Sequence, residues 1–282
     1  MDARVPQLVA LDIEVEACAP SRFPYGASFW AYAAFLREVA ALDPDAASRA
    51  HGAPGQDKEA LLTISGLLKN GVAPLSTVEL EPGERATVRV SAAGERLVIA
   101  VAKALDPSRL PGTLNIGPNQ VRITEARLAA VGAPNPASLD DLLEAGASAS
   151  GPLRLRFPSP TTFERKHLWL AIPSPDVVFG RSGQLPTGLL RYWRMLGGDA
   201  LESFSSSHVG AVPLWLEPCT ARLLFDGGKE WSAPAFVGEC EYTAHPDEQP
   251  ALHTLGLLAQ FTGIGQRVAF GMGRVERVDP IS

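Results

Sequence analysis

The sequence has few residues of the kinds that build disulfide frameworks or metal sites. Its three cysteines, Cys18, Cys219 and Cys240, are odd in number and contain no CxxC pair, which argues against a disulfide framework and a zinc knuckle. The five histidines are scattered, and none lies three or four residues from another. We therefore expect reduced cysteines, no histidine-based metal site and no bound cofactor, while a site made only of carboxylates stays open.

Long apolar runs are also missing. The longest, such as residues 97–102, stop far short of the roughly 18 residues of a membrane-spanning helix, and the first residues lack a charged-then-apolar targeting pattern. We therefore expect a cytoplasmic protein. The chain has 282 residues, of which 46% are apolar and 20% charged, and this is enough material for two globular cores.

Positive charge is not in excess. Phosphate neutralisation by a protein usually appears as a basic patch, so a net charge of -6 counts against a nucleic-acid partner. The acidity lies mainly in residues 1–150, with 13 basic and 18 acidic residues, whereas the remainder has 12 basic and 13 acidic residues. Because binding depends on the local potential, a basic groove can coexist with an acidic remainder.

Strand and helix patterns alternate along the first half of the chain. Residues 7–16 alternate apolar and polar side chains, as a half-buried strand does. Residues 27–42 carry apolar side chains at helical spacing and are closed by Asp43 and Pro44. Further strands are expected at residues 61–68, 86–90 and 120–128, and a second helix at 94–105. The order is βαββαβ.

The second half repeats this order without a detectable sequence repeat. The segment 132–151 is rich in Ala, Ser, Pro and Gly and is the best candidate boundary, although Leu139, Leu142 and Leu143 allow one helical turn. Strands are expected at residues 152–157, 219–225, 235–242 and 268–278, and helices at 187–196 and 249–261. We therefore predict an α+β protein of two tandem ferredoxin-like (RRM-like) domains, residues 1–135 and 150–282, each with helices on one face of its sheet.

The most informative segment, GIGQRVAFGMG, follows a predicted helix and enters a predicted strand. Its paired glycines, Gly263 with Gly265 and Gly271 with Gly273, flank Arg267. Glycine has no Cβ, so such a loop can adopt positive φ and bring its backbone amides close to another chain or to phosphates. A dinucleotide fingerprint lies between a strand and a following helix, so this segment is not one. The alternative is a tightly packed turn at the edge of a domain.

This segment closely resembles the C-terminal glycine-rich signature of CRISPR repeat-RNA processing endoribonucleases, which belong to the repeat-associated RAMP superfamily. The segment 159–163, SPTTF, is similar to the end of the first strand in that family's second domain, and 236–242, FVGECEY, to the strand before its last helix. The resemblance spans residues 152–278. It implies two ferredoxin-like domains and a protein that binds and cleaves RNA, with the glycine-rich loop and Arg267 holding the RNA backbone.

The N-terminal resemblance is looser and carries the candidate catalytic residues. The segments 23–25, 30–32 and 62–67 follow the family's order. The resemblance implies a catalytic histidine at His51, a tyrosine on the preceding helix at Tyr32 and a lysine a few residues on at Lys58. From the residues alone, an imidazole in the glycine- and proline-rich segment 50–55 can give or take a proton near neutral pH. The plain alternatives are a solvated loop histidine for His51, a core tyrosine for Tyr32 and a solvated charge run for Lys58.

Two further arginines, Arg154 and Arg156, share one face of the strand expected at residues 152–157. They are candidates to follow a phosphate backbone, and the alternative is a merely exposed face. His208 follows three serines, but no GxSxG elbow supports a serine hydrolase.

The resemblance implies cleavage without a metal ion. RNA carries its own nucleophile, the 2′-hydroxyl beside the scissile phosphate. The expected products from a CRISPR repeat are therefore a 2′,3′-cyclic phosphate and a 5′-hydroxyl, and DNA is not cut. In this mechanism His51 would act as base or acid, Lys58 would stabilise negative charge and Tyr32 would orient the hydroxyl.

The expected partners are the repeat RNA, single-stranded or with a small hairpin, and other subunits of a CRISPR effector complex. Two alternatives to the endoribonuclease stay open. One is a catalytically inactive RNA-binding subunit of the same superfamily. The other is a ferredoxin-like small-ligand enzyme or sensor, which would need an apolar pocket with convergent polar groups.

Overall fold

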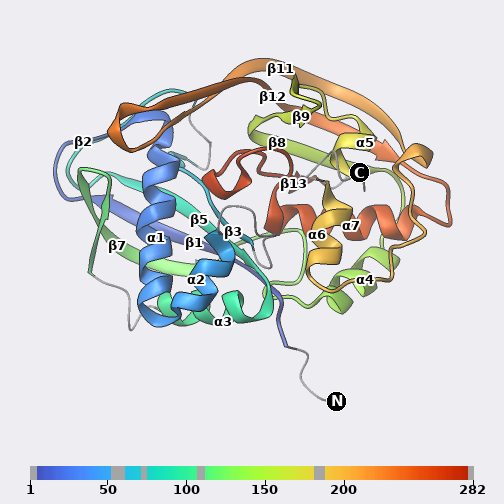
Figure 1. The fold of residues 1–282 in the computed structure, drawn as a ribbon, viewed down its shortest axis with the longest axis horizontal. Coiled ribbons are helices and arrows are strands. Elements are labelled where there is room, and N and C mark those ends of the chain that lie inside the picture. Colours follow the sequence, from blue (N-terminus) through green and yellow to red (C-terminus); the bar gives the residue numbers. More distant parts are fainter. Residues whose placement is uncertain (1–4, 52–60, 71–74, 107–111, 181–187, 279–282) are drawn as a thin grey trace.

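The computed structural model describes residues 5–51, 61–70, 75–106, 112–180 and 188–278 (Figure 1). In this part of the chain, one antiparallel sheet from each half of the sequence lies beside the other, with helices packed on them. Within the described ranges, no helix is both long enough and apolar enough to span a membrane.

The first sheet has the antiparallel strand order β3-β5-β1-β7-β6. Its strands are β1 (Leu8–Ala17), β3 (Leu61–Ile64), β5 (Arg85–Ala93), β6 (Thr113–Ile116) and β7 (Asn119–Leu128). Val9, Ile13 and Val15 of β1 are buried in the core of this half, and the alternation of a strand puts Asp12 and Glu14 on the opposite face.

The helices of this half are α1 (Ser28–Leu42), α2 (Pro44–His51) and α3 (Glu95–Ala104), and a separate ribbon pairs β2 (Ser21–Phe23) with β4 (Val78–Leu80). With β6 set aside, strands β3-β5-β1-β7 and the crossover helices α1 and α3 form a ferredoxin-like βαββαβ unit.

The second sheet has the strand order β11-β12-β8-β13. It contains β8 (Leu153–Thr161), β11 (Gly210–Leu224), β12 (Glu230–Thr243) and β13 (Glu276–Arg277), while β9 (Phe163–Arg165) and β10 (Leu168–Leu170) form a separate hairpin. Along the chain, the helices α5 (Pro175–Val178) and α6 (Leu189–Met195) come between β8 and β11, and α7 (Gln249–Thr262) comes between β12 and β13. This is the same βαββαβ order, so the prediction of two tandem ferredoxin-like units is confirmed.

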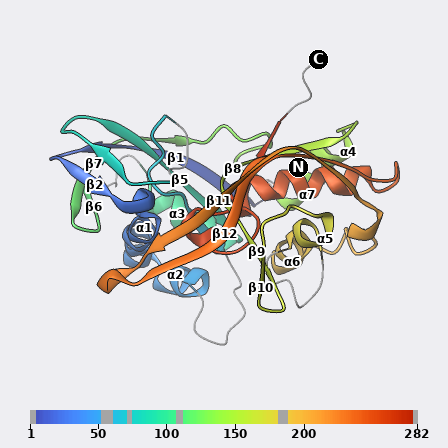
Figure 2. The same cartoon turned by 90° about the horizontal axis from the view of Figure 1, so that it is seen from above.

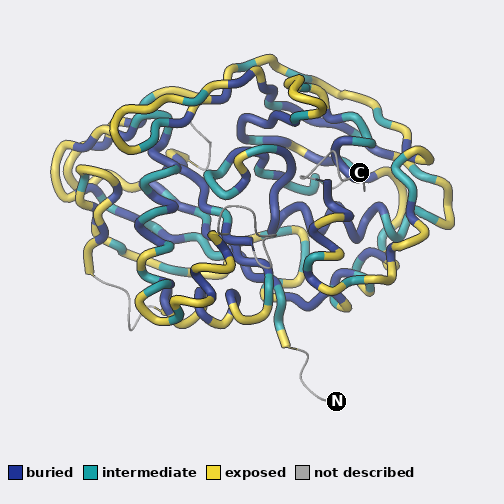
Figure 3. Tube along the Cα trace, viewed as in Figure 1, coloured by how far each residue is buried: buried dark blue, intermediate teal, exposed yellow. Residues whose placement is uncertain are grey.

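Helix α7 is buried on all sides along most of its length. Every residue from Leu252 to Thr262 is buried, because the helix packs on β8 and α6 and also touches β1, β3 and β5 of the first sheet (Figures 1 and 3). One apolar cluster accordingly joins Leu8 and Ala93 of the first sheet to Leu255 and Leu258 of α7. The two halves of the chain therefore share a core along this helix.

The segment expected to interrupt the periodicity is ordered. It contains α4 (Leu139–Ala147), which is a full helix and not one turn. The helix begins with a capping box, in which Ser138 and Asp141 each bond to the other's backbone amide. Its residues Leu139 and Leu142 are buried in the same cluster as α7. The domain limits 1–135 and 150–282 stay a prediction.

The final strand expected at residues 268–278 is wrong for most of its length. Only Glu276–Arg277 pair with β8, and Val268–Phe270 form a 3-10 turn. The physical reason is a left-handed backbone at both ends of that turn, with φ of 60° at Arg267 and 73° at Gly271. An extended strand cannot continue through such residues.

The hairpin of β11 and β12 is longer than the expected strands at 219–225 and 235–242. It forms a long arm that crosses from the second sheet to the start of α1 (Figures 1 and 2).

The residues around His51 also differ from the expected loop. Asp43 and Pro44 end α1, but they begin α2 at the same point, because the Asp43 carboxylate accepts a hydrogen bond from the backbone N–H of Ala46 at 3.0 Å. Proline is well suited to the first position of a helix. His51 is therefore the last residue of a helix.

Candidate nucleic-acid interface

The four glycines of the loop between α7 and β13, here called the glycine-rich loop (residues 263–273), all have positive φ. A Cβ on Gly265 would lie 2.5 Å from the carbonyl oxygen of Thr162, and one on Gly273 would overlap the carbonyl of Ile264. A Cβ on Gly271 would lie 2.6 Å from the Cα of Ser65 and 2.8 Å from the carbonyl oxygen of Ile64 in β3. Contacts with the protein's own backbone therefore account for these glycines, as in the tightly packed turn.

Backbone hydrogen bonds hold this loop against the end of β8. Ile264 donates to the carbonyl of Gly273 at 2.8 Å, Gln266 to Thr162 at 2.8 Å, and Gly273 to Pro160 at 3.0 Å. Thr162 and Pro160 belong to the SPTTF segment, so the two motifs singled out in the sequence form one structural unit. Whether Gly263, Gly265, Gly271 and Gly273 also touch RNA stays a prediction.

Arg267 projects from this loop at its exposed turn. Its guanidinium carbon lies 5.5 Å from the centre of the Trp231 ring, and Trp231 packs edge-on against Trp169 with ring centroids 5.6 Å apart. No carboxylate of the described residues lies within ion-pair distance of Arg267. An exposed arginine that is held by a ring and leaves its charge unneutralised suits a phosphate contact.

Arg154 and Arg156 lie on one face of β8, as expected, but they are paired. Glu239 lies 3.5 Å from Arg154 and 3.3 Å from Arg156, and Glu241 lies 3.7 Å from Arg154. The two glutamates stand opposite the two arginines in the register of β8 and β12. This face of the sheet is therefore largely neutral, which strand periodicity alone could not reveal. An RNA-binding role for these arginines stays a prediction.

His51 and Tyr32 lie beside each other, although 19 positions separate them in the chain. Their ring centroids are 6.2 Å apart. His51 is exposed at the end of α2, whereas Tyr32 on α1 is only 3% exposed, and burial raises the pKa of its phenol to about 12. The Tyr32 hydroxyl has no hydrogen-bond partner among the described residues. Lys58, the third candidate, lies outside the described residues.

The glycine-rich loop reaches this pair through Phe270. The Phe270 ring packs edge-on against Tyr32, with centroids 5.1 Å apart. Sequence reasoning did not select Phe270, although it lies between the paired glycines of the motif. The structure thus brings two candidate catalytic residues and the candidate RNA-binding loop to one place.

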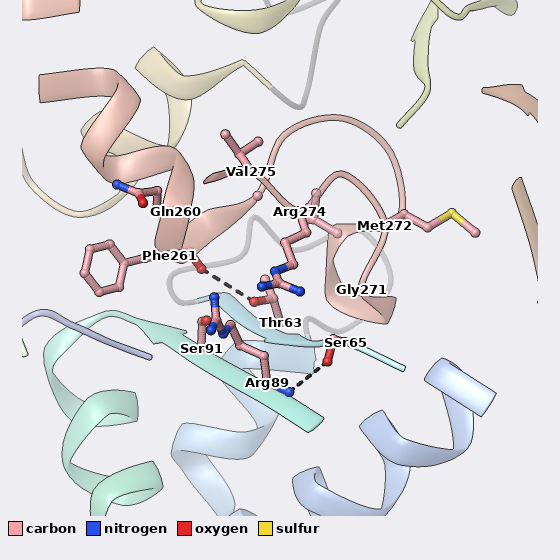
Figure 4. Close-up of a pocket in the computed structure, with 12 residues that line it drawn as sticks. Thr63, Ser65, Arg89, Ser91, Gln260, Phe261, Gly271, Met272, Arg274 and Val275 are labelled. Atoms are coloured by element: carbon pink, nitrogen blue, oxygen red, sulfur yellow. Dashed lines mark hydrogen bonds between the residues drawn. The ribbon is translucent and has the colours of Figure 1, made fainter. Parts of the chain in front are cut away.

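A small pocket lined by both polar and apolar side chains lies at the seam between the first sheet and this loop (Figure 4). Arg89 from β5 points into it and makes two hydrogen bonds to Asp12, at 2.8 and 3.0 Å. Arg274 follows the loop and donates to Glu276 at 2.7 Å. Burial lowers the pKa of Arg274, and the neighbouring charge of Arg89 adds to this effect. Sequence reasoning missed both arginines, although Arg274 directly follows the last glycine of the motif.

The tip of the β11–β12 hairpin docks on the start of α1. The Tyr25 hydroxyl donates to Glu230 at 2.8 Å and accepts from Arg222 at 3.2 Å, and the Trp30 indole donates to Asp226 at 3.0 Å. Tyr25 has an unusual φ of 49°, which turns the chain immediately before α1. The N-terminal segments 23–25 and 30–32 that carried the family resemblance are thus the docking surface of this hairpin.

In the part of the chain that the structure describes, no group of three His, Cys, Asp or Glu residues could hold a metal ion.

The family resemblance has independent support in the second half of the chain. A family model described as CRISPR-associated endoribonuclease Cas6 matches residues 155–275, from β8 to the residue before β13. This range includes the SPTTF segment and the whole glycine-rich loop. No curated protein matches the sequence.

Solved structures share the fold over nearly the whole chain. Cas6 from Thermus thermophilus aligns with a TM-score of 0.65 and 19% identity, covering 98% of this chain and 100% of that chain. A product complex of the same Cas6 has a TM-score of 0.70 and 20% identity, with 97% and 100% coverage. A Cas6 substrate mimic complex has a TM-score of 0.63 and 24% identity, with 96% and 99% coverage. The second half of the chain therefore matches the Cas6 family model, and the whole chain shares the fold of solved Cas6 structures.

Proposed function

We propose that this protein is a metal-independent endoribonuclease that cleaves CRISPR precursor RNA within its repeats. The observation that carries the proposal is the meeting of His51, Tyr32 and the glycine-rich loop, which are far apart in the sequence. Tyr32 thereby lies between a possible proton-transfer group, His51, and the loop that would hold the RNA. Solved structures of this fold include Cas6 product and substrate mimic complexes and a RAMP protein binding different RNA substrates, which supports an RNA substrate for this chain.

The proposed chemistry uses the 2′-hydroxyl of the RNA as nucleophile. His51, which is exposed, removes the proton from this hydroxyl or donates one to the departing 5′-oxygen. The ends formed are a 2′,3′-cyclic phosphate and a 5′-hydroxyl. Lys58 is proposed to stabilise the negative charge that develops on the phosphate.

Tyr32 takes part as a neutral phenol. A pKa of about 12 means that its hydroxyl keeps its proton at neutral pH, so it can donate a hydrogen bond but cannot serve as a base there. Because its ring is buried, only the hydroxyl end is free to orient the RNA or the His51 ring. The raised pKa therefore excludes Tyr32 as a base at neutral pH, and the role implied by the family resemblance, orienting the 2′-hydroxyl, is still open to it.

RNA binding is proposed to centre on Arg267 and the backbone of the glycine-rich loop. The net charge of the chain is -6, and Arg154 and Arg156 already pair with glutamates, so the attraction for phosphates must be local. Arg267 supplies a positive charge that no described carboxylate neutralises.

The direct test is the variant His51→Ala, assayed for binding and for cleavage of the repeat RNA. We expect unchanged RNA affinity and a cleavage rate about 10²–10⁴-fold lower, the usual contribution of one general acid or base. Stability should hardly change, because His51 is exposed at a helix end.

The matched control for that variant is His245→Ala. Its side chain is also exposed, at 67%, and it precedes α7. It should cleave like the parent. A parent protein that binds the repeat without cleaving it would instead establish the alternative, a catalytically inactive RNA-binding subunit.

A further inference from the structure

Phe270 lies where three parts of the molecule meet. It packs against the apolar core of the first sheet and its helices. It also packs against a small apolar cluster of the hairpin and the glycine-rich loop, which consists of Ala221, Leu223, Ala235 and Met272. One side chain thus joins the loop to the element that carries Tyr32.

A row of aromatic rings runs from the hairpin tip to the candidate catalytic histidine. Phe225 lies 4.9 Å from Phe29, Phe29 lies 5.6 Å from Phe270, Phe270 lies 5.1 Å from Tyr32, and Tyr32 lies 6.2 Å from His51, measured between ring centroids. The first three contacts are edge-to-face, the arrangement that aromatic pairs prefer.

The backbone that carries Phe270 has little freedom to shift. Its amide donates to the carbonyl of Arg267 at 2.9 Å, and the next residue, Gly271, sits against Ser65 of the chain segment that follows β3. The loop is also bonded to the end of β8 through Gly273 and Pro160. Packed interiors deform very little, so the position of the Phe270 ring is set by both sheets.

Tyr32, in contrast, is held by packing alone. Its hydroxyl has no hydrogen-bond partner among the described residues, so nothing but the surrounding side chains fixes its ring. If the edge of Phe270 is removed, the Tyr32 ring gains room to change its rotamer, and the His51 ring loses the surface beside it. Small displacements of a catalytic group have large effects on rate.

We propose that Phe270 is a positioning residue for RNA cleavage, which acts by fixing Tyr32 and, through it, the imidazole of His51. The inference rests on the proposed function, because it requires His51 to act on RNA. It assigns a second task to the glycine-rich loop, which then shapes the catalytic site as well as holding the RNA.

The test compares Phe270→Leu and Phe270→Met with Phe270→Tyr. Leucine and methionine keep the apolar contacts but remove the ring, whereas tyrosine keeps the ring. Phe179→Leu is the matched control, because Phe179 is a fully buried phenylalanine with edge-to-face contacts to Phe204 and Tyr242 in the second half. Thermal unfolding of every variant separates loss of the fold from loss of positioning.

The readouts are RNA affinity and the cleavage rate in a single turnover at saturating protein. We expect Phe270→Leu and Phe270→Met to cleave about 10- to 100-fold more slowly, with RNA affinity unchanged. Phe270→Tyr should cleave at the parental rate. Phe179→Leu should lose thermal stability and keep the parental rate.

A double-mutant cycle with His51→Ala shows whether Phe270 acts through the histidine. Adding Phe270→Leu to His51→Ala should lower the rate no further. The positioning role would be overturned by an additive loss of cleavage rate in the double variant, by a fall in RNA affinity alone, or by a parental rate in both Phe270→Leu and Phe270→Met. None of these results would contradict the proposed nuclease activity. A parent protein that does not cleave RNA would overturn the proposed function itself, and the positioning role with it.

Discussion

Single residues of the glycine-rich loop are fixed by close backbone contacts. Gly271 has a φ of 73° and faces Ser65 and Ile64 at distances that no Cβ tolerates. The neighbouring atoms belong to the backbone of β3 and the residue after it, and they cannot move aside as a flexible side chain would. The loop therefore depends on glycine at this position even before any RNA is bound.

We predict that Gly271→Ala lowers the free energy of unfolding by about 3 kcal/mol, because left-handed strain adds to a backbone clash. Its RNA affinity should fall as well, since the loop must shift. Denaturant unfolding and RNA titration measure the two effects.

The matched control is Gly83→Ala. Gly83 has a similar φ of 83°, but a Cβ there would meet nothing within 4 Å. It should lose only the left-handed strain, about 1–2 kcal/mol, and keep its RNA affinity. If both variants lowered the free energy of unfolding equally, the close contact of Gly271 with β3 would contribute nothing to stability.

We predict that Arg267 contacts an RNA phosphate. Arg267→Ala should weaken binding to all RNA sequences alike and reduce the slope of log affinity against log salt by about 1, as the loss of one phosphate contact requires. Arg127→Ala is the control, because Arg127 is exposed but already pairs with Glu125 at 3.2 Å. A change of preference among repeats at constant slope would instead identify Arg267 as a base-reading residue.

Individual residues show what the sequence could and could not reveal. The glycines and Arg267 could be selected as candidates from the sequence, because a rare pattern marks them, and their RNA-binding role stays a prediction. Glu239 as partner of Arg154 and Arg156 was not identifiable, since it depends on the register of β12 against β8. Phe270 was not identifiable either, because its importance comes from contacts with Tyr32 and Phe29, which are more than 200 positions away in the chain.

Among the secondary-structure elements, the long ones were predicted well. Helix α7 was expected at residues 249–261 and spans Gln249–Thr262. Elements defined by local backbone chemistry were missed. These include α2, which begins at the residues that end α1, and the 3-10 turn at Val268–Phe270, which replaces most of the expected last strand.

Helix α7 also contains a buried histidine, for which we predict an effect of pH on stability. His253 is 1% exposed; its Nε2 atom lies 2.9 Å from the carbonyl oxygen of Gly151, and its buried Nδ1 atom has no partner among the described residues. Burial lowers the pKa of His253 below its ordinary value of 6.5, and the charge of Arg277 lowers it further, against the opposing effect of the Gly151 carbonyl.

It follows that the folded protein resists protonation at this position. Between pH 6.5 and the lower pKa of the folded state, the unfolded chain binds a proton at His253 that the folded chain does not. Over this range stability falls as the pH decreases, by up to about 1.4 kcal/mol per pH unit. His253→Gln retains a donor for the Gly151 carbonyl and cannot titrate. We predict that this variant loses less stability than the parent between pH 7 and pH 5. Parallel stability curves for the two proteins would exclude His253 as the source.

At the scale of the whole molecule, the proposed function depends on how the two ferredoxin-like units are joined. The sequence predicted each unit from the repeated βαββαβ order. The shared core along α7 and the docking of the hairpin on Tyr25 and Trp30 were not predictable. Contacts between elements that are far apart in the chain produce no periodic pattern in the sequence. The glycine-rich loop reaches Tyr32 through Phe270, and Tyr32 in turn lies beside His51.

One cleavage assay on the repeat RNA tests whether the RNA supplies its own nucleophile. The parent protein is given the natural repeat with and without a chelator, and a repeat with a single 2′-deoxy substitution immediately upstream of the cut. We predict that cleavage survives the chelator, because no metal-bound water is needed, and that the deoxy substrate stays intact. Inhibition by the chelator, or cleavage of the deoxy substrate, would contradict attack by the 2′-hydroxyl.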